Sequence, residues 1–163
     1  MPSPRASDMM SKLIATLSPD TDIYTAIQTL LKKRISGAPV VDDRGGLVGM
    51  LSEKDCLKVL TAEAFEGLPE GKVADYMTST VEVVLPSTHI WDIVHQLLNR
   101  RFRRLPVVDR DGRLVGLVTR RDVLAAIESM RDNPLLYGTQ DHHLELEEEG
   151  WGVDSAMRRA RGR

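Results

Sequence analysis

The chain contains the same pattern twice, in two segments that align without a gap. Residues 8–60 and 75–127 keep a constant offset of 67 positions. The residues that keep this offset include Pro39 and Pro106, Gly49 and Gly116, and Asp55 and Asp122. Two units of about fifty residues are too few for a solenoid, in which three or more stacked units usually share a core. We therefore expect two small subdomains that pack face to face near a pseudo-twofold axis.

Each repeat begins with a helical pattern. Apolar residues recur at the spacing of one helix face in both copies. They are Ile23, Ala26, Ile27, Leu30 and Leu31 in the first copy and Ile90, Ile93, Val94, Leu97 and Leu98 in the second. A short apolar run, at 14–17 or 81–85, precedes each helix and is predicted to form a strand.

A hairpin and a second helix complete each unit. The apolar runs at 39–41 and 47–51 enclose a turn rich in Asp and Gly, which is typical of a β-hairpin. The twin of this hairpin spans 106–118. The final helices begin after Ser52 and Thr119. Their apolar residues, predicted to face the core, are Leu57, Leu60, Val123, Leu124 and Ile127. The order β-α-β-β-α in each unit places the chain in the α+β class.

Three segments lie outside the two repeats. Residues 1–7 form an N-terminal extension, 61–74 a connector that contains two glycines and a proline, and 128–163 a charged tail. The tail carries an acidic run at 145–149 and a basic end, a composition typical of a solvated segment.

The composition excludes several classes of protein. At 163 residues, with 42% hydrophobic residues and a net charge of −2, the chain has the composition of a globular domain rather than of a nucleic-acid or membrane binder. Cys56 is the single cysteine, no apolar run approaches the roughly 18 residues of a membrane span, and Met1 to Ser7 lack the hydrophobic region of a secretory signal. We therefore expect a cytoplasmic protein with no membrane partner. An aromatic content of 4% argues against a base-stacking surface for nucleic acid.

Each hairpin runs into the pattern Gly-apolar-x-Ser/Thr-x-x-Asp. It reads 49–55 in the first repeat and 116–122 in the second. The pairs Ser52 with Asp55 and Thr119 with Asp122 fit a capping box, in which a hydroxyl and an acid satisfy the free backbone donors of a helix start. Capping alone does not explain the glycine that stands three residues before each hydroxyl.

The paired repeats, the blocks at 38–42 and 105–109 and the two Gly-apolar-x-Ser/Thr-x-x-Asp endings resemble a tandem pair of CBS domains, often called a Bateman module. The resemblance covers residues 8–127. It implies two pseudo-twofold-related subdomains packed through their sheets. It also implies a regulatory or sensor role, in which AMP, ADP, ATP or a related adenosyl compound binds in clefts between the repeats and the module signals occupancy to a partner protein or to its own homodimer.

The same resemblance implies two composite clefts and the residues that line them. In each, the aspartate would take the ribose hydroxyls and the Ser/Thr region would lie near ribose and phosphate, which agrees with the preference of carboxylates for hydroxyls and of helix N-termini for phosphate. The first cleft would combine Ser36, Met50, Ser52, Lys54, Asp55, Glu82, Arg103 or Arg104, and Arg121. The second would combine Ala15, Ser36 or Gly37, Lys54, Arg103, Leu117, Thr119, Arg120, Arg121 and Asp122.

The two clefts are predicted to be unequal. Ser36 and Gly37 stand where the second repeat has Arg103 and Arg104. Because arginine binds phosphate with two parallel bonds, the Asp55 cleft is predicted to be the better phosphate site. We expect a nucleotide to occupy one cleft before it occupies both.

Two alternatives to a nucleotide sensor stay open. The eight arginines of residues 75–127 and the basic end could meet a phosphate polymer such as nucleic acid, or the module could serve only as a structural dimer. No nucleophile, acid–base pair or metal-ligand pair can be placed in one site, so the sequence offers no catalytic residue, no metal site and no catalytic cofactor.

Overall fold

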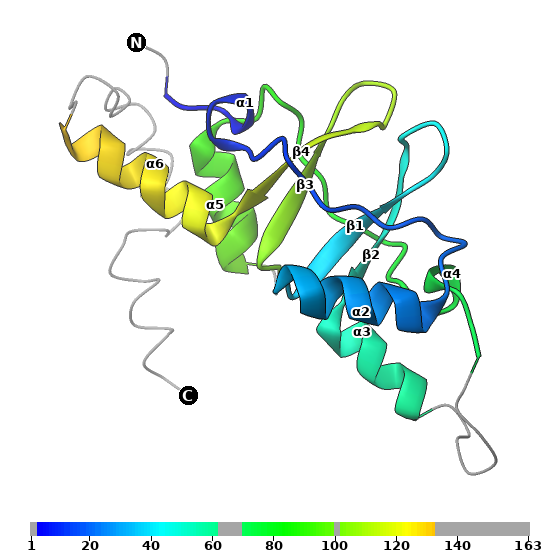
Figure 1. The fold of residues 1–163 in the computed structure, drawn as a ribbon. Helices are drawn as coiled ribbons and strands as arrows, with labels where there is room; N and C mark the ends of the chain where they lie inside the picture. The colour runs from blue at the N-terminus through cyan, green and yellow to red at the C-terminus, as the bar shows by residue number, and fades with distance from the viewer. Residues whose placement is uncertain (1–2, 62–69, 100–101, 133–163) are drawn as a thin grey trace.

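The computed structural model describes residues 3–61, 70–99 and 102–132, which form two similar units side by side (Figure 1). The first unit holds a helix, a hairpin and a second helix, and the second unit repeats this order. The elements are α1 (Ala6–Met9), α2 (Ile23–Lys33), β1 (Gly37–Val41), β2 (Leu47–Ser52), α3 (Glu53–Leu57), the 3-10 turn η1 (Lys58–Leu60), α4 (Val73–Tyr76), α5 (Ile90–Asn99), β3 (Arg104–Val108), β4 (Leu114–Thr119) and α6 (Arg120–Asp132).

Both predicted hairpins are confirmed. Strands β1 and β2 pair antiparallel, as do β3 and β4, and each pair carries a register shift at the same place. The turns depend on Gly45 and Gly112, which adopt φ angles of 79° and 78° that few other residues tolerate. The side chains of Asp42 and Asp109 accept backbone N–H bonds across these turns. The local sequence therefore determines the conformation of each turn.

The strands predicted at 14–17 and 81–85 are reduced to single parallel bridges. Leu17 pairs with Val40, and Val84 pairs with Val107. The prediction of full strands was wrong. Just before each bridge the chain pairs with the other unit instead of its own, because Ser11, for example, forms an antiparallel bridge with Leu117.

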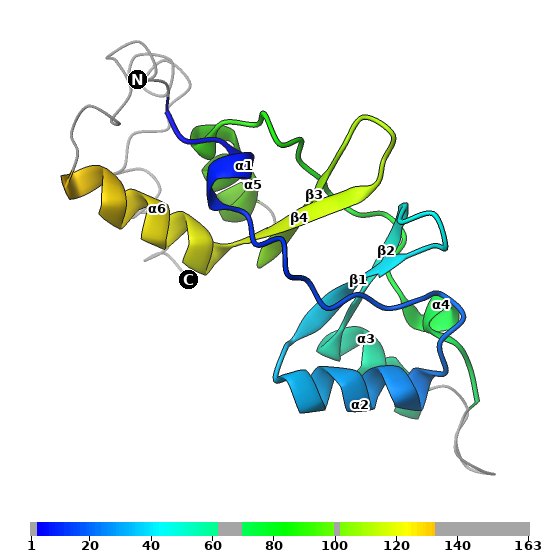
Figure 2. The ribbon, with the colours of Figure 1, turned by 45° about the horizontal axis from the view of Figure 1, so that its top comes forward.

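The short helices α1 and α4, which the sequence did not reveal, each pack in the unit of the opposite repeat. Ala6 of α1 is fully buried in the second core, and Ala6 N–H donates to Thr88 O at 2.8 Å. Val73 of α4 is fully buried in the first core, and its N–H donates to Thr21 O at 2.8 Å. In Figure 2 the N-terminal segment runs from α1, beside α5, across to the first unit. Each unit is thus completed by a segment from outside its own repeat.

The helix faces are narrower than the periodicity predicted. On α2 the buried residues are Ile23, Ala26 and Leu30, whereas Leu31 is exposed, as is its twin Leu98 on α5. The prediction that the apolar residues of the final helices face the core was also wrong in part. Val123 is buried, and the exposed residues are Leu57, Leu124 and Ile127; the side chain of Leu60 lies outside the described set. These exposed leucines form no part of either core.

The two units meet at their hairpins. Leu47 N–H donates to Gly112 O and Leu114 N–H donates to Gly45 O, both at 3.0 Å, so the two turns bond to each other symmetrically. This contact fixes the pseudo-twofold arrangement that the repeat predicted. Within the described residues, no helix has both the length and the apolar character needed to cross a membrane.

Candidate functional site

The two Ser/Thr-x-x-Asp motifs are capping boxes, as predicted. Ser52 Oγ accepts the Asp55 N–H at 3.1 Å, and Asp55 Oδ2 accepts the Ser52 N–H at 3.0 Å. The corresponding distances for Thr119 and Asp122 are 3.3 and 2.7 Å. Each motif therefore holds its aspartate at the first turn of the following helix.

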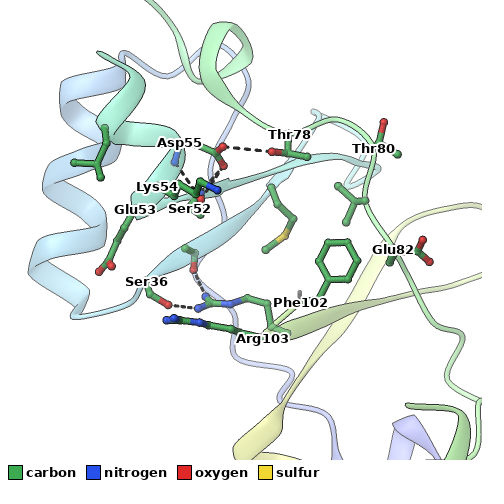
Figure 3. Close-up of a pocket in the computed structure, with 15 residues that line it drawn as sticks. Ser36, Ser52, Glu53, Lys54, Asp55, Thr78, Thr80, Glu82, Phe102 and Arg103 are labelled. Carbon is green, nitrogen blue, oxygen red and sulfur yellow. Dashed lines mark hydrogen bonds between the residues drawn. The ribbon is translucent and has the colours of Figure 1, made fainter. Parts of the chain in front are cut away.

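A cavity of about 530 Å³ opens beside Asp55, between the two units (Figure 3). Its walls come from β1, from the end of β2 and the start of α3, from the segment after α4, and from the start of β3. The lining residues are Ser36, Gly37, Met50, Ser52, Glu53, Lys54, Asp55, Leu57, Thr78, Thr80, Val81, Glu82, Phe102, Arg103 and Arg104. The cavity is composite, as the resemblance implied, because both repeats contribute side chains.

Asp55 is a buried carboxylate with both oxygens engaged. Oδ2 accepts bonds from the N–H and the hydroxyl of Ser52 at 3.0 and 2.9 Å. Oδ1 accepts the Lys58 ammonium at 2.9 Å and the Thr78 hydroxyl at 3.3 Å. Burial acts to raise the pKa of Asp55, but the bonds from Lys58 and Ser52 outweigh burial, so the pKa lies below its ordinary value of 3.8. The group is therefore ionised at neutral pH.

Arg104 connects the two units across the cavity. From β3 its guanidinium donates to Gly37 O at 2.6 Å and to Ser36 Oγ. Burial, together with the neighbouring Arg103, lowers the pKa of Arg104, although the group stays charged near neutral pH. Arg103 is exposed at the mouth of the same cavity and is the freer of the two guanidinium groups.

A second cavity, of about 340 Å³, lies at the pseudo-equivalent place. Its lining residues are Ser11, Leu13, Ile14, Ala15, Arg34, Ile35, Ser36, Gly37, Pro39, Arg104, Leu117 and Thr119. Asp122 is absent from this lining. It borders a separate cavity of about 490 Å³ on the side of α1, together with Asp8 and Ala125.

The structure therefore assembles the two predicted clefts to different degrees. Every residue predicted for the Asp55 cleft lines one cavity except Arg121, which is exposed and lines none of the cavities described above. The second cavity brings together Ala15, Leu117 and Thr119 with Ser36, Gly37 and Arg104. The remaining residues predicted there lie elsewhere: Lys54 and Arg103 line the Asp55 cavity, Asp122 borders the third cavity, and Arg120 is exposed and donates to Phe102 O at 3.4 Å. Arg120 and Arg121, at the start of α6, are both exposed.

Several residues of the Asp55 cavity were not predicted from the sequence, among them Thr78, Thr80 and Phe102. No motif marks these three, because they lie outside the Gly-apolar-x-Ser/Thr-x-x-Asp pattern. Their twins, Ser11, Leu13 and Ile35, line the second cavity. In the part of the chain that the structure describes, no group of three or more His, Cys, Asp and Glu side chains could hold a metal ion.

The fold and the paired clefts agree with a known class of protein. The profile of the CBS domain matches residues 6–62 and 73–129, so the chain belongs to the CBS-domain family and carries the domain twice. The tandem CBS pair expected from the repeat is therefore confirmed.

Two curated relatives are similar over most of the described residues. The uncharacterized protein MJ1225 of Methanocaldococcus jannaschii is 35% identical over 75% of this chain, and the chloroplastic CBS domain-containing protein CBSX2 of Arabidopsis thaliana is 35% identical over 71%. The chain spans 42% and 60% of their respective lengths, less than two thirds of either.

Solved structures give the same fold. A crystal structure of CBSX2 in complex with AMP is 34% identical, with a TM-score of 0.70, and the match covers 78% of this chain and 98% of the crystallised chain. The CBS domain pair of protein MJ0100 in complex with 5′-methylthioadenosine and S-adenosyl-L-methionine is 26% identical, with a TM-score of 0.67 over 78% of this chain and 98% of that pair. Related CBS pairs thus bind compounds that contain adenosine.

Proposed function

We propose that this chain is a regulatory module that binds an adenine nucleotide in the cavity beside Asp55. One observation carries the proposal: a buried, ionised carboxylate of the first repeat shares a cavity with Arg103 and Arg104 of the second. A carboxylate can accept bonds from two ribose hydroxyls, and arginine suits the planar, two-bond recognition of phosphate. A nucleotide is a ligand that uses both groups together.

The rest of the cavity fits such a ligand. Its volume of about 530 Å³ lies within the range of about 300–1,000 Å³ that is usual for small-molecule sites. Met50, Val81 and Phe102 provide apolar surface on which a purine base can lie. Lys54 and Arg103 provide positive charge for the phosphate.

The relatives support adenosine as the common part of the ligand. CBSX2 was crystallised with AMP, and the MJ0100 pair with two adenosyl compounds. The arginines favour a ligand with phosphate, so we expect AMP, ADP or ATP to bind here in preference to an uncharged nucleoside.

Occupancy of the cavity can be signalled because its walls belong to both repeats. A nucleotide that contacts both walls favours one relative arrangement of the units, and a partner that recognises this arrangement then binds more tightly or more weakly. The partner can be another protein or a second copy of this chain. In this role the nucleotide is a regulatory ligand rather than the cofactor of a reaction.

A homodimer fits the surface of the helices. Leu31 on α2 and its twin Leu98 on α5 are exposed, and so are Leu57 of α3 and its twin Leu124 of α6. Large apolar residues repeated on pseudo-symmetric faces suit a symmetric contact between copies. Light scattering should give the mass of a dimer for the wild-type chain and of a monomer for a variant with Leu57→Glu and Leu124→Glu.

Calorimetry with AMP, ADP and ATP tests the nucleotide site. We expect one site to fill first and Asp55→Ala to abolish it, whereas Asp43→Ala, which removes an exposed carboxylate, should bind as the wild type does. At a nucleotide concentration of 100 times Kd the free energy of unfolding should rise by about 2.7 kcal/mol. Two equal and independent sites would contradict the predicted inequality. No binding at millimolar nucleotide, with binding to a polymer that falls steeply with salt, would favour the nucleic-acid alternative.

A further inference from the structure

The two pseudo-equivalent aspartates differ in what holds their outer oxygen. Oδ1 of Asp55 accepts the Lys58 ammonium at 2.9 Å and the Thr78 hydroxyl at 3.3 Å. Both side-chain bonds of Asp122 go to Oδ2, from the N–H and the hydroxyl of Thr119, each at 2.7 Å. The twin of Lys58 is Ala125, which cannot supply a cation. Among the described residues, a lysine therefore pairs with one of the two aspartates, and no cation pairs with Oδ1 of the other.

Asp55 has no acceptor site to spare. An ionised carboxylate offers about four lone-pair positions, and Asp55 uses four: two on Oδ2 for Ser52 and two on Oδ1. The Oδ2 bonds form the capping box, so losing them would release the start of α3. A ribose diol that binds Asp55 must therefore take the place of Lys58, Thr78 or both at Oδ1.

Of the two side chains at Oδ1, Lys58 makes the stronger bond to Asp55. It is also the more easily displaced by a ligand, because its side chain is exposed. Its bond is short and charged, whereas the Thr78 bond is long. The Lys58 side chain is 54% exposed, against 8% for Asp55, so the ammonium can turn into water when the carboxylate is taken. Lys58 is not among the described residues that line the cavity, so it acts on a ligand through Asp55.

We propose that Lys58 is a positioning residue that competes with the ribose diol for Oδ1 of Asp55 and so weakens nucleotide binding in this cleft. This inference rests on the proposed function, because it requires a ligand whose ribose reaches Asp55. It assigns a role to a residue outside the motif and outside the cavity. It also gives the cleft a built-in counter-ion, which holds the carboxylate ionised and satisfied when no ligand is bound.

Calorimetry with two ligands tests the competition. AMP carries the diol, and 2′,3′-dideoxy-AMP has the same base and phosphate without it. Lys58→Met should raise the affinity for AMP about two- to fivefold, the range expected when a partly exposed ion pair no longer has to be broken. The same variant should bind the dideoxy compound as weakly as the wild type does.

Two other results would overturn the proposed role of Lys58. If Lys58 attracts phosphate through space, Lys58→Met will lower the affinity for both ligands equally, and the inference fails. An unchanged affinity for AMP overturns it as well. Ala125→Lys is the matched control: it adds a lysine at the twin position and should leave AMP binding in the Asp55 cleft unaltered.

The design separates this inference from the proposed function. Loss of AMP binding in Asp55→Ala establishes the site, and a failure of Lys58→Met to strengthen binding then overturns the role of Lys58 alone. If the wild-type chain binds no AMP, both fall.

Discussion

The side chains of the Asp55 cavity divide into those that hold the two units together and those that are available to a ligand. Arg104 is half-buried and bonded to Ser36 and Gly37 of the opposite unit. Arg103, its neighbour in sequence, is exposed and makes no side-chain hydrogen bond or ion pair within the described residues. The two adjacent arginines therefore differ in their contacts, although the sequence presents them alike.

This difference predicts two separable phenotypes. Arg103→Met should weaken AMP binding about tenfold, the loss of one charged contact to phosphate, and leave stability within about 0.5 kcal/mol of the wild type. Arg104→Met should lower the free energy of unfolding by about 1–3 kcal/mol, because it leaves the carbonyl of Gly37 without its donor. Urea unfolding and AMP titration of both variants check this. Equal losses of stability would contradict it.

Asp55 should make the stability of the chain depend on pH. Its folded pKa lies below its ordinary value of 3.8, so the ionised form stabilises the fold fully above that value, and the contribution is lost as the pH falls through the folded pKa. Asp55→Asn should therefore cost about 1–3 kcal/mol at pH 7 and progressively less below about pH 4. Urea unfolding from pH 7 down to pH 3 measures the difference, with Asp43→Asn as an exposed control. A difference that does not change with pH would refute the assignment.

At the scale of the elements, the glycine of each motif has an explanation that capping could not give. A Cβ on Gly49 would lie 2.6 Å from Met77 Sδ and 3.0 Å from Thr78 O. Met50 and Thr78 exchange two backbone bonds at 2.9 Å just beside it. Gly116 meets the side chain of its own partner, Met10, in the same way. The glycines allow the crossing segments to lie flat on β2 and β4.

Gly49→Ala should therefore destabilise the chain through overpacking. We expect a loss of about 1–3 kcal/mol, since the backbone of Thr78 cannot move without breaking its pairing with Met50. Thermal unfolding measures it, and Gly49→Ala combined with Met77→Ala should recover the part that is due to the methionine. A variant as stable as the wild type would show that the crossing segment is not held against β2.

The elements that the sequence predicted are those set by near neighbours in the chain. Hairpins follow from Asp and Gly at the turns, and the capping boxes from residues three apart. Leu31 and Leu98 are exposed, and they show what periodicity does not predict. Periodicity identifies the apolar face of a helix, but it does not indicate how much of that face a small core can cover. The ion pair of Lys58 with Asp55 was overlooked for another reason: an i, i+3 pair on a short helix has no counterpart in the twin motif.

At the scale of the whole molecule, the repeat in sequence differs from the unit in space. Ala6 stands before the first repeat and lies in the second core, whereas Val73 stands in the connector and lies in the first core. These two positions are twins, 67 residues apart. The constant offset of the repeat makes them equivalent, but it carries no information on which core each one enters, because both arrangements give the same pattern.

Because each core includes a residue from outside its own repeat, a substitution at either twin should destabilise the unit in which that residue is buried. Val73→Asp and Ala6→Asp each place an unpaired carboxylate in a core, which should lower stability by several kcal/mol and open the unit concerned before the other. Hydrogen exchange should then speed up in β1 and β2 for Val73→Asp, and in β3 and β4 for Ala6→Asp. Faster exchange in β3 and β4 for Ala6→Asp would not be expected from the sequence, because Ala6 is about a hundred residues from β3. Faster exchange in β1 and β2 for Ala6→Asp would mean that each repeat folds on itself, and the clefts would then have to be built from different walls.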